Sequence, residues 1–167
     1  MNLKLKIWRQ PDAKSRGQWE EYDVTDLDES MSVLEMLDRL SEQLVSEGKE
    51  AVAFESDCRE GICGACGMMV NGFAQGPQQN TPACHQRLRS FKDGQTVRLE
   101  PFTSGSYPVL RDLIVDRRAL DTVIRAGGFV SVNAGTAPDA EALPVNHTTV
   151  EEALDFAACI GCGACVA

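Results

Sequence analysis

The spacing of the cysteines is the strongest constraint on how this chain can fold. The 167 residues include seven cysteines in two groups, Cys58, Cys63, Cys66 and Cys84, and then Cys159, Cys162 and Cys165. An odd number of thiols cannot be closed by disulfides within one chain. A reducing compartment would keep thiols free in any case. A role other than disulfide formation must therefore explain them.

The first group has the plant-type spacing of a [2Fe–2S] cluster, in which four and then two residues separate the first three cysteines. A loop with this spacing must fold around the cluster so that several sulfurs point inward and backbone N–H groups approach the inorganic sulfides. Glycine permits that approach because it has no Cβ and accepts positive φ. Glycines interleave the clustered cysteines at Gly61, Gly64 and Gly67.

The charges around this loop suit an anionic group that gains an electron. No Asp, Glu, Lys or Arg occurs between Gly61 and Gln86, so that stretch holds no carboxylate to oppose reduction. Hydrogen-bond donors and the adjacent Arg59 favour reduction. We expect Glu60 to point away from the cluster.

Other sites explain the first group less well. Structural zinc usually takes its four thiolates from two pairs with two to four residues between partners, whereas Cys84 stands alone. Buried inert thiols account for one or two cysteines but not for this pattern. A Rieske centre needs two histidine ligands, and His85 and His147 do not form a paired motif. We expect His85 to be a supporting or surface residue, and assign no role to His147.

The second group matches the opening of the bacterial-type run of ferredoxin cysteines, which binds a [4Fe–4S] cluster. Such a cluster takes four thiolates, whereas the sequence ends two residues after Cys165. We expect the protein to continue beyond Ala167 and to supply the missing ligand there. The alternative is an unusual three-ligand site.

The charge balance excludes some partners. A formal charge of −9, from 16 basic and 25 acidic side chains, disfavours nucleic acid and anionic membrane surfaces, since both attract clustered Lys and Arg. The longest stretch without charged residues is rich in Gly, Gln, Asn and Pro, unlike a membrane span of ~20 apolar residues. The N-terminus lacks the apolar core and cleavage site of a signal peptide. We therefore expect a cytoplasmic location.

Local patterns predict a small α+β domain over residues 1–105. Ser32 and Glu35 form a capping box, which opens a helix predicted over 33–47. Asn71-Gly72 is typical of a tight hairpin turn, because both residues tolerate positive φ. Alternating or short apolar runs predict the strands. They lie near 3–7, 19–24, 68–70, 73–74 and 97–99.

Residues 106–167 predict the beginning of a second, mainly helical domain. The stretch from Pro101 to Pro108 has the composition of a linker. One helical face is then predicted to end at Gly127-Gly128; it comprises Leu110, Leu113, Ile114, Arg117, Leu120 and Ile124. Residues 129–148 show no periodicity and predict a loop. Thr149 begins a second capping box, which opens a helix toward Cys159.

The sequence resembles the iron–sulfur subunit family of succinate dehydrogenase and fumarate reductase. The resemblance rests on three segments, Ser56–Gly67, Pro108–Asp116 and Cys159–Cys165. The middle segment matters most, because ordinary ferredoxins carry no such sequence after their last strand. The match extends from the first strand to the last residue.

The resemblance implies an N-terminal β-grasp [2Fe–2S] ferredoxin-like domain, followed by the start of an all-α ferredoxin-like domain for [4Fe–4S] and [3Fe–4S] clusters. The implied [2Fe–2S] ligands are Cys58, Cys63, Cys66 and Cys84. The implied [4Fe–4S] ligands are Cys159, Cys162 and Cys165, with the fourth absent from this sequence. The [3Fe–4S] ligands are expected beyond Ala167.

The implied function is to pass single electrons between the FAD of a flavoprotein subunit and a membrane quinone at anchor subunits. The chain would then be the electron-transfer subunit of a succinate:quinone oxidoreductase, peripheral on the inner face of a bacterial cell membrane. It needs no catalytic residue of its own. We interpret Arg111, Asp112 and Asp116 as helix-surface or interdomain salt-bridge residues. The direction of catalysis is left open.

Two alternatives are kept. A freestanding [2Fe–2S] ferredoxin-type carrier would shuttle between soluble partners and expose a polar surface. The iron–sulfur portion of another multi-cluster oxidoreductase, such as a molybdenum hydroxylase, also combines a plant-type loop with a helical domain. That family, however, spaces its second cysteine set differently.

Overall fold

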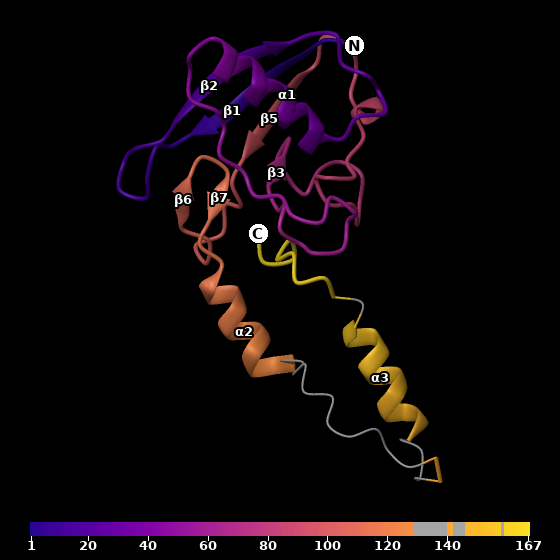
Figure 1. Cartoon of the computed structure of the whole chain (residues 1–167). Helices are drawn as coiled ribbons and strands as arrows, with labels where there is room; N and C mark the ends of the chain where they lie inside the picture. The colour runs from indigo at the N-terminus through magenta and orange to yellow at the C-terminus, as the bar shows by residue number, and fades with distance from the viewer. Residues whose placement is uncertain (129–139, 142–145, 158) are drawn as a thin grey trace.

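The computed structural model describes residues 1–128, 140–141, 146–157 and 159–167. Residues 1–115 build a body around a mixed sheet, and two helices, over 118–128 and 147–157, extend away from it (Figure 1). After the second helix, the C-terminal segment returns to the body. The predicted α+β class is confirmed.

A five-stranded sheet forms the centre of the body, with the order β2-β1-β5-β3-β4. Strands β1 and β5 pair in parallel, and the other pairs are antiparallel. The strands are β1 (Leu3–Arg9), β2 (Gln18–Val24), β3 (Met69–Val70), β4 (Phe73–Ala74) and β5 (Thr96–Glu100). Each lies where the sequence predicts one. Asn71 and Gly72 form the turn between β3 and β4 with φ of 53° and 81°, as a tight hairpin requires.

Helix α1 (Val33–Ser46) shares one hydrophobic core with the sheet, as a β-grasp arrangement requires. The predicted capping box is present: the Ser32 N–H donates to a Glu35 carboxylate oxygen at 2.6 Å, and the Glu35 N–H donates to Ser32 Oγ at 3.2 Å. A short 3-10 turn, η1 (Leu88–Ser90), lies between the hairpin and β5. The buried residues of α1 are Val33, Leu34, Met36, Leu37, Leu40 and Leu44.

The prediction of a helix that begins at Leu110 is wrong for the first half of that segment. A hairpin of β6 (Val109–Arg111) and β7 (Ile114–Val115) occupies this segment, and α2 (Arg118–Gly128) begins only after it. The apolar residues follow a helical period, but Leu113 is buried in the core of the body whereas Leu110 is 43% exposed. Tertiary contacts at the hairpin turn therefore override the local pattern.

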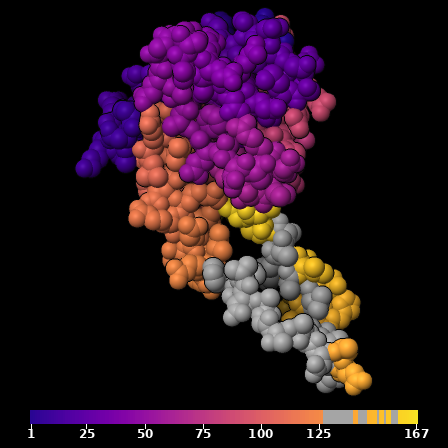
Figure 2. Space-filling view, in the orientation of Figure 1, coloured from indigo at the N-terminus to yellow at the C-terminus, as the bar shows by residue number. Residues whose placement is uncertain are grey.

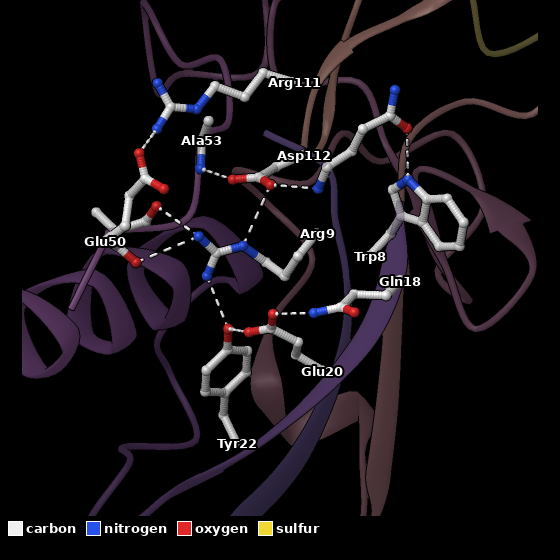
Figure 3. Close-up of polar contacts among 11 residues, drawn as sticks. Trp8, Arg9, Gln18, Glu20, Tyr22, Glu50, Ala53, Arg111 and Asp112 are labelled. Atoms are coloured by element: carbon white, nitrogen blue, oxygen red, sulfur yellow. Dashed lines mark hydrogen bonds and ion pairs between the residues drawn. The ribbon is translucent and has the colours of Figure 1, made fainter. Parts of the chain in front are cut away.

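Asp112, at the turn of this hairpin with φ 44°, is a buried anchor rather than a helix-surface residue. Its carboxylate accepts the backbone N–H groups of Gln10 and Ala53, both at 2.8 Å (Figure 3). Arg9 Nε lies 3.2 Å from Asp112 Oδ1, and Arg9 Nη1 donates to the Tyr22 hydroxyl at 2.7 Å. The interdomain salt bridge that the sequence suggests is thus the Arg9–Asp112 pair, which joins the hairpin to β1.

Arg111 and Asp116 make the other ion pairs of this region. Arg111 pairs with Glu50 of the body at the surface (Figure 3). Asp116 accepts the backbone N–H of Arg118 at 3.0 Å and pairs with its guanidinium. The hydrogen bonds from Arg118 lower the pKa of the Asp116 carboxyl to about 2. Asp116 therefore caps the first turn of α2.

The predicted linker between Pro101 and Pro108 is packed rather than free. Phe102 and Tyr107 are both 2% exposed. They belong to a second apolar cluster that combines residues from β3, β7 and α2, with C-terminal Ala164 packed against it. Its buried members are Met69, Phe102, Tyr107, Val115 and Leu120. This cluster extends across the predicted domain boundary at 105/106.

Helix α3 (His147–Ala157) begins two residues before the predicted capping box. The Asn146 side chain accepts the backbone N–H of Thr148 at 2.9 Å, so Asn146 caps the helix. Most of the loop predicted over 129–148 lies outside the described residues. Within the described part of the chain, no helix has the length and apolar character to span a bilayer.

Replacement of Asp112 by alanine should lower the free energy of unfolding by about 3 kcal/mol or more, because it leaves the largely buried Arg9 without its countercharge. The side chains of Arg9 and Asp112 are only 11% and 3% exposed. Asp112→Asn should cost less, since the amide oxygen still accepts one N–H. Urea denaturation measures both changes.

The matched control is Glu50→Ala, which removes an ion pair whose two side chains are 43% and 65% exposed. Exposed pairs contribute at most about 1 kcal/mol. A loss in Asp112→Ala no greater than that in Glu50→Ala would contradict the anchoring role.

Candidate metal centre

The first three cysteines lie on the irregular segment that joins α1 to β3, and Cys84 lies on the turn before η1. Cys66 and Cys84 are buried, with 5% and 6% exposure. Cys58 is half-buried and Cys63 is exposed. The site therefore has an inner side within the body and an outer side toward solvent.

Backbone N–H groups point at the sulfurs of the outer cysteines. The Glu60 N–H donates to Cys58 Sγ at 3.3 Å and the Ala65 N–H donates to Cys63 Sγ at 3.4 Å. Three residues of this segment have positive φ, 56° at Arg59, 75° at Gly61 and 71° at Gly64. Gly61 and Gly64 therefore have the conformational role that the sequence predicts, whereas Gly67 has no positive φ and instead lies against the Phe102 ring.

The thiols influence one another's ionisation. Hydrogen bonds from the backbone N–H groups of Glu60 and Ile62 lower the pKa of Cys58 to about 7, with help from the Cys63 thiol. Burial raises the pKa of Cys84 to about 11, and neighbouring Cys66 and Cys58 add to the rise. All four predicted ligands thus belong to one electrostatic neighbourhood.

The donor set consists of four thiols with N–H groups aimed at sulfur. Over the described ranges, no three His, Cys, Asp or Glu side chains gather closely enough to hold one metal ion. A [2Fe–2S] cluster takes four thiolates spread around two irons and receives hydrogen bonds at sulfur. The N–H groups aimed at Cys58 and Cys63 match that need. The assignment of the four ligands itself stays a prediction.

The second cysteine group follows α3 and repeats the pattern of the first. The Gly161 N–H donates to Cys159 Sγ at 3.4 Å, and Gly161 and Gly163 have φ of 65° and 76°. The Tyr107 hydroxyl donates to the Gly163 carbonyl at 3.1 Å in a buried position. The body therefore holds this loop by a specific hydrogen bond.

The structure brings the two cysteine loops into direct backbone contact. A Cβ placed on Gly64 would lie 2.6 Å from the Ile160 carbonyl oxygen and 2.8 Å from the Cα of Cys162. Figure 2 shows the C-terminal residues, in yellow, seated against the body beside the segment that carries the first loop. Gly64 is thus needed for close approach as well as for its φ.

Arg117 joins the two loops, and sequence reasoning missed it. Its Nη1 donates to the Gly64 carbonyl at 2.7 Å, and its Nη2 donates to the Gly161 carbonyl. The sequence placed Arg117 on a helical face, whereas it precedes the first residue of α2. No local signal distinguishes it from the neighbouring Arg118.

Other residues near the first loop have clear positions. Arg59 pairs with Asp38 of α1, and this hydrogen bond raises the pKa of Arg59. Its charge is therefore shared with a carboxylate. Glu60 is exposed, and half-buried His85 lies beside Gly61, with its Cδ2 3.5 Å from a Cβ built there. A supporting position for His85 agrees with the sequence-based expectation.

Comparison with known proteins identifies relatives of this chain. A family model described as a 2Fe-2S iron-sulfur cluster binding domain matches residues 4–122. The fumarate reductase iron-sulfur subunit of Escherichia coli O6:H1 is 28% identical, over 99% of this chain and 62% of its own length. The succinate dehydrogenase iron-sulfur subunit of Bacillus subtilis is 27% identical, over 98% of this chain and 62% of its own length.

A solved structure gives the same fold. A chain of the Mycobacterium smegmatis Sdh1 complex in the apo form aligns with a TM-score of 0.73 at 24% identity, over 98% of this chain and 62% of that chain. The predicted resemblance is thereby confirmed. The chain spans about three fifths of the length of these relatives.

Two glycine variants test the contact between the loops. Gly64→Ala and Gly72→Ala both place a Cβ on a residue with positive φ, at 71° and 81°, which costs roughly 1–2 kcal/mol in each. A Cβ at Gly72 meets nothing within 4 Å, whereas one at Gly64 meets the second loop at 2.6 Å. Gly64→Ala should lose about 1–3 kcal/mol more, measured by urea denaturation. Equal losses would show that the loops do not touch.

Proposed function

The chain belongs to the family of 2Fe-2S iron-sulfur cluster binding domains, and from that premise we propose that it is the iron–sulfur electron-transfer subunit of a succinate dehydrogenase or fumarate reductase. The observation that carries the proposal is the backbone contact between two cysteine loops, each with N–H groups aimed at sulfur. The names of the relatives support the same assignment.

The proposed ligands follow from the two loops. Cys58, Cys63, Cys66 and Cys84 would hold a [2Fe–2S] cluster. Cys159, Cys162 and Cys165 would provide three of the four thiolates of a [4Fe–4S] cluster, and a [3Fe–4S] cluster belongs to the proposed complete protein. When bound, such groups accept and release one electron at a time. The protein's own part is to hold the thiolates, to donate hydrogen bonds to sulfur and to set the burial that tunes reduction.

The proposed partners are an FAD-containing flavoprotein subunit on one side and membrane anchor subunits with a quinone on the other. The partners follow from the relatives, which are named as iron-sulfur subunits of fumarate reductase and succinate dehydrogenase. Ile62 in the first loop is 69% exposed and so is available to a partner. Through these partners, the chain would lie on the inner face of the cell membrane.

A freestanding carrier with one [2Fe–2S] cluster explains less. It has no use for a second cysteine loop held against the first by Tyr107 and Arg117. A chain that passes electrons onward needs such a neighbour. The packing thus favours a subunit with several clusters.

The test is electron paramagnetic resonance on the complete protein, purified without oxygen and reduced with dithionite. Cys63→Ser should remove or alter the [2Fe–2S] signal, because it replaces one proposed ligand. Cys165→Ser is the matched control: it should leave that signal unchanged and affect only the second group. Absence of the signal in the wild-type protein, together with bound zinc, would refute the proposal.

A further inference from the structure

Arg117 bridges the two cysteine loops. It lies two residues after β7 (Ile114–Val115) and directly before α2. Its guanidinium donates to two backbone carbonyls, those of Gly64 and Gly161. Since β7 belongs to the hairpin that Asp112 anchors, the backbone of Arg117 is fixed to the body on one side.

Each accepting carbonyl lies inside a cysteine motif. Gly64 follows Cys63 directly, and Gly161 precedes Cys162 directly. The guanidinium is a planar fork whose donors have fixed separations. A side chain that uses this fork on both loops restrains the distance between them, as well as the position of each loop.

The charge of Arg117 is not neutralised by a carboxylate in the part of the chain that the structure describes. None of the ion pairs found there includes it. Glu55 and Arg117 line one small cavity, but Glu55 is exposed and forms no ion pair with Arg117. The adjacent Arg118, in contrast, is paired with Asp116.

The hydrogen bonds of Arg117 place its charge beside both loops. The Gly64 carbonyl that it binds belongs to the residue after Cys63, and the Gly161 carbonyl belongs to the residue before Cys162. The cation is therefore bonded to the backbone of both cysteine motifs. Thiolate-ligated clusters become more negative when they gain an electron, and a nearby positive charge favours that state.

We infer that Arg117 is a positioning residue that holds the two cysteine loops at a fixed separation and whose positive charge favours the reduced state of the groups they bind. The inference rests on the proposed function for the groups themselves. The restraint between the loops depends only on the two hydrogen bonds and can be measured independently of it.

Two substitutions separate the fork from the charge. Arg117→Lys keeps the charge but replaces the planar fork by a compact ammonium, which cannot reproduce both hydrogen bonds. Arg117→Gln loses the charge as well. Arg118→Gln is the matched control, because it removes a neighbouring guanidinium whose side chain is 88% exposed and pairs with Asp116. Circular dichroism verifies that each variant is folded.

The first measurement is amide hydrogen exchange in the cluster-loaded complete protein, read over residues 58–67 and 159–165. Both Arg117 variants should exchange about tenfold faster than the wild type in the second loop, as the loss of a charge-assisted hydrogen bond implies. Arg118→Gln should match the wild type. Wild-type exchange in either Arg117 variant overturns the positioning role.

The second measurement is a redox titration of the [2Fe–2S] signal. Arg117→Gln should lower the equilibrium constant for reduction about tenfold, equal to about 59 mV for a one-electron couple. Arg117→Lys and Arg118→Gln should remain near the wild type. An unchanged potential in Arg117→Gln overturns the electrostatic role. A wild-type protein without the signal refutes the proposed function instead, and the exchange experiment then still decides the restraint.

Discussion

The close approach of two backbone segments, at Gly64 and at Cys162, is the contact on which the rest of the candidate site depends. It requires a residue without a side chain at Gly64, since an added Cβ would lie 2.6 Å from the Ile160 carbonyl. Both loops have glycines with positive φ and N–H groups that donate to sulfur, and carbonyls of both loops accept hydrogen bonds from the body. Arg117 and Tyr107 bind these carbonyls. This contact therefore fixes the distance between the two cysteine loops.

A buried ion pair in the body supports that contact by fixing the hairpin that precedes Arg117. Asp112 binds Arg9 and two backbone N–H groups, and so fixes the hairpin of β6 and β7 to the C-terminal end of β1. The same hairpin carries Val115 into the second apolar cluster and places Arg117 at the start of α2. The Arg9–Asp112 pair is therefore connected to the cysteine loops through the hairpin and Arg117.

Elements with strong local signals could be predicted from the sequence. The capping box at Ser32, the Asn71-Gly72 turn and the alternation of β1 each depend on residues only a few positions apart. The segment from Leu110 to Arg117 could not, because its apolar residues fit a helix as well as a hairpin that is fixed by the distant Arg9. Spacing divides the seven cysteines into two groups, but the contact between the groups joins residues far apart in the sequence. The hydrogen bonds of Arg117 likewise join residues far apart in the sequence.

The second apolar cluster limits how the two halves of the chain can be exchanged during evolution. Phe102 and Tyr107 belong to the connection between the two halves, Met69 comes from the sheet, and Leu120 and Ala164 come from the helical part. A different ferredoxin domain joined at this boundary would lack the surface that receives Tyr107 and the C-terminal turn. The two halves are therefore not interchangeable modules. We expect them to be inherited together, with substitutions in one compensated by substitutions in the other.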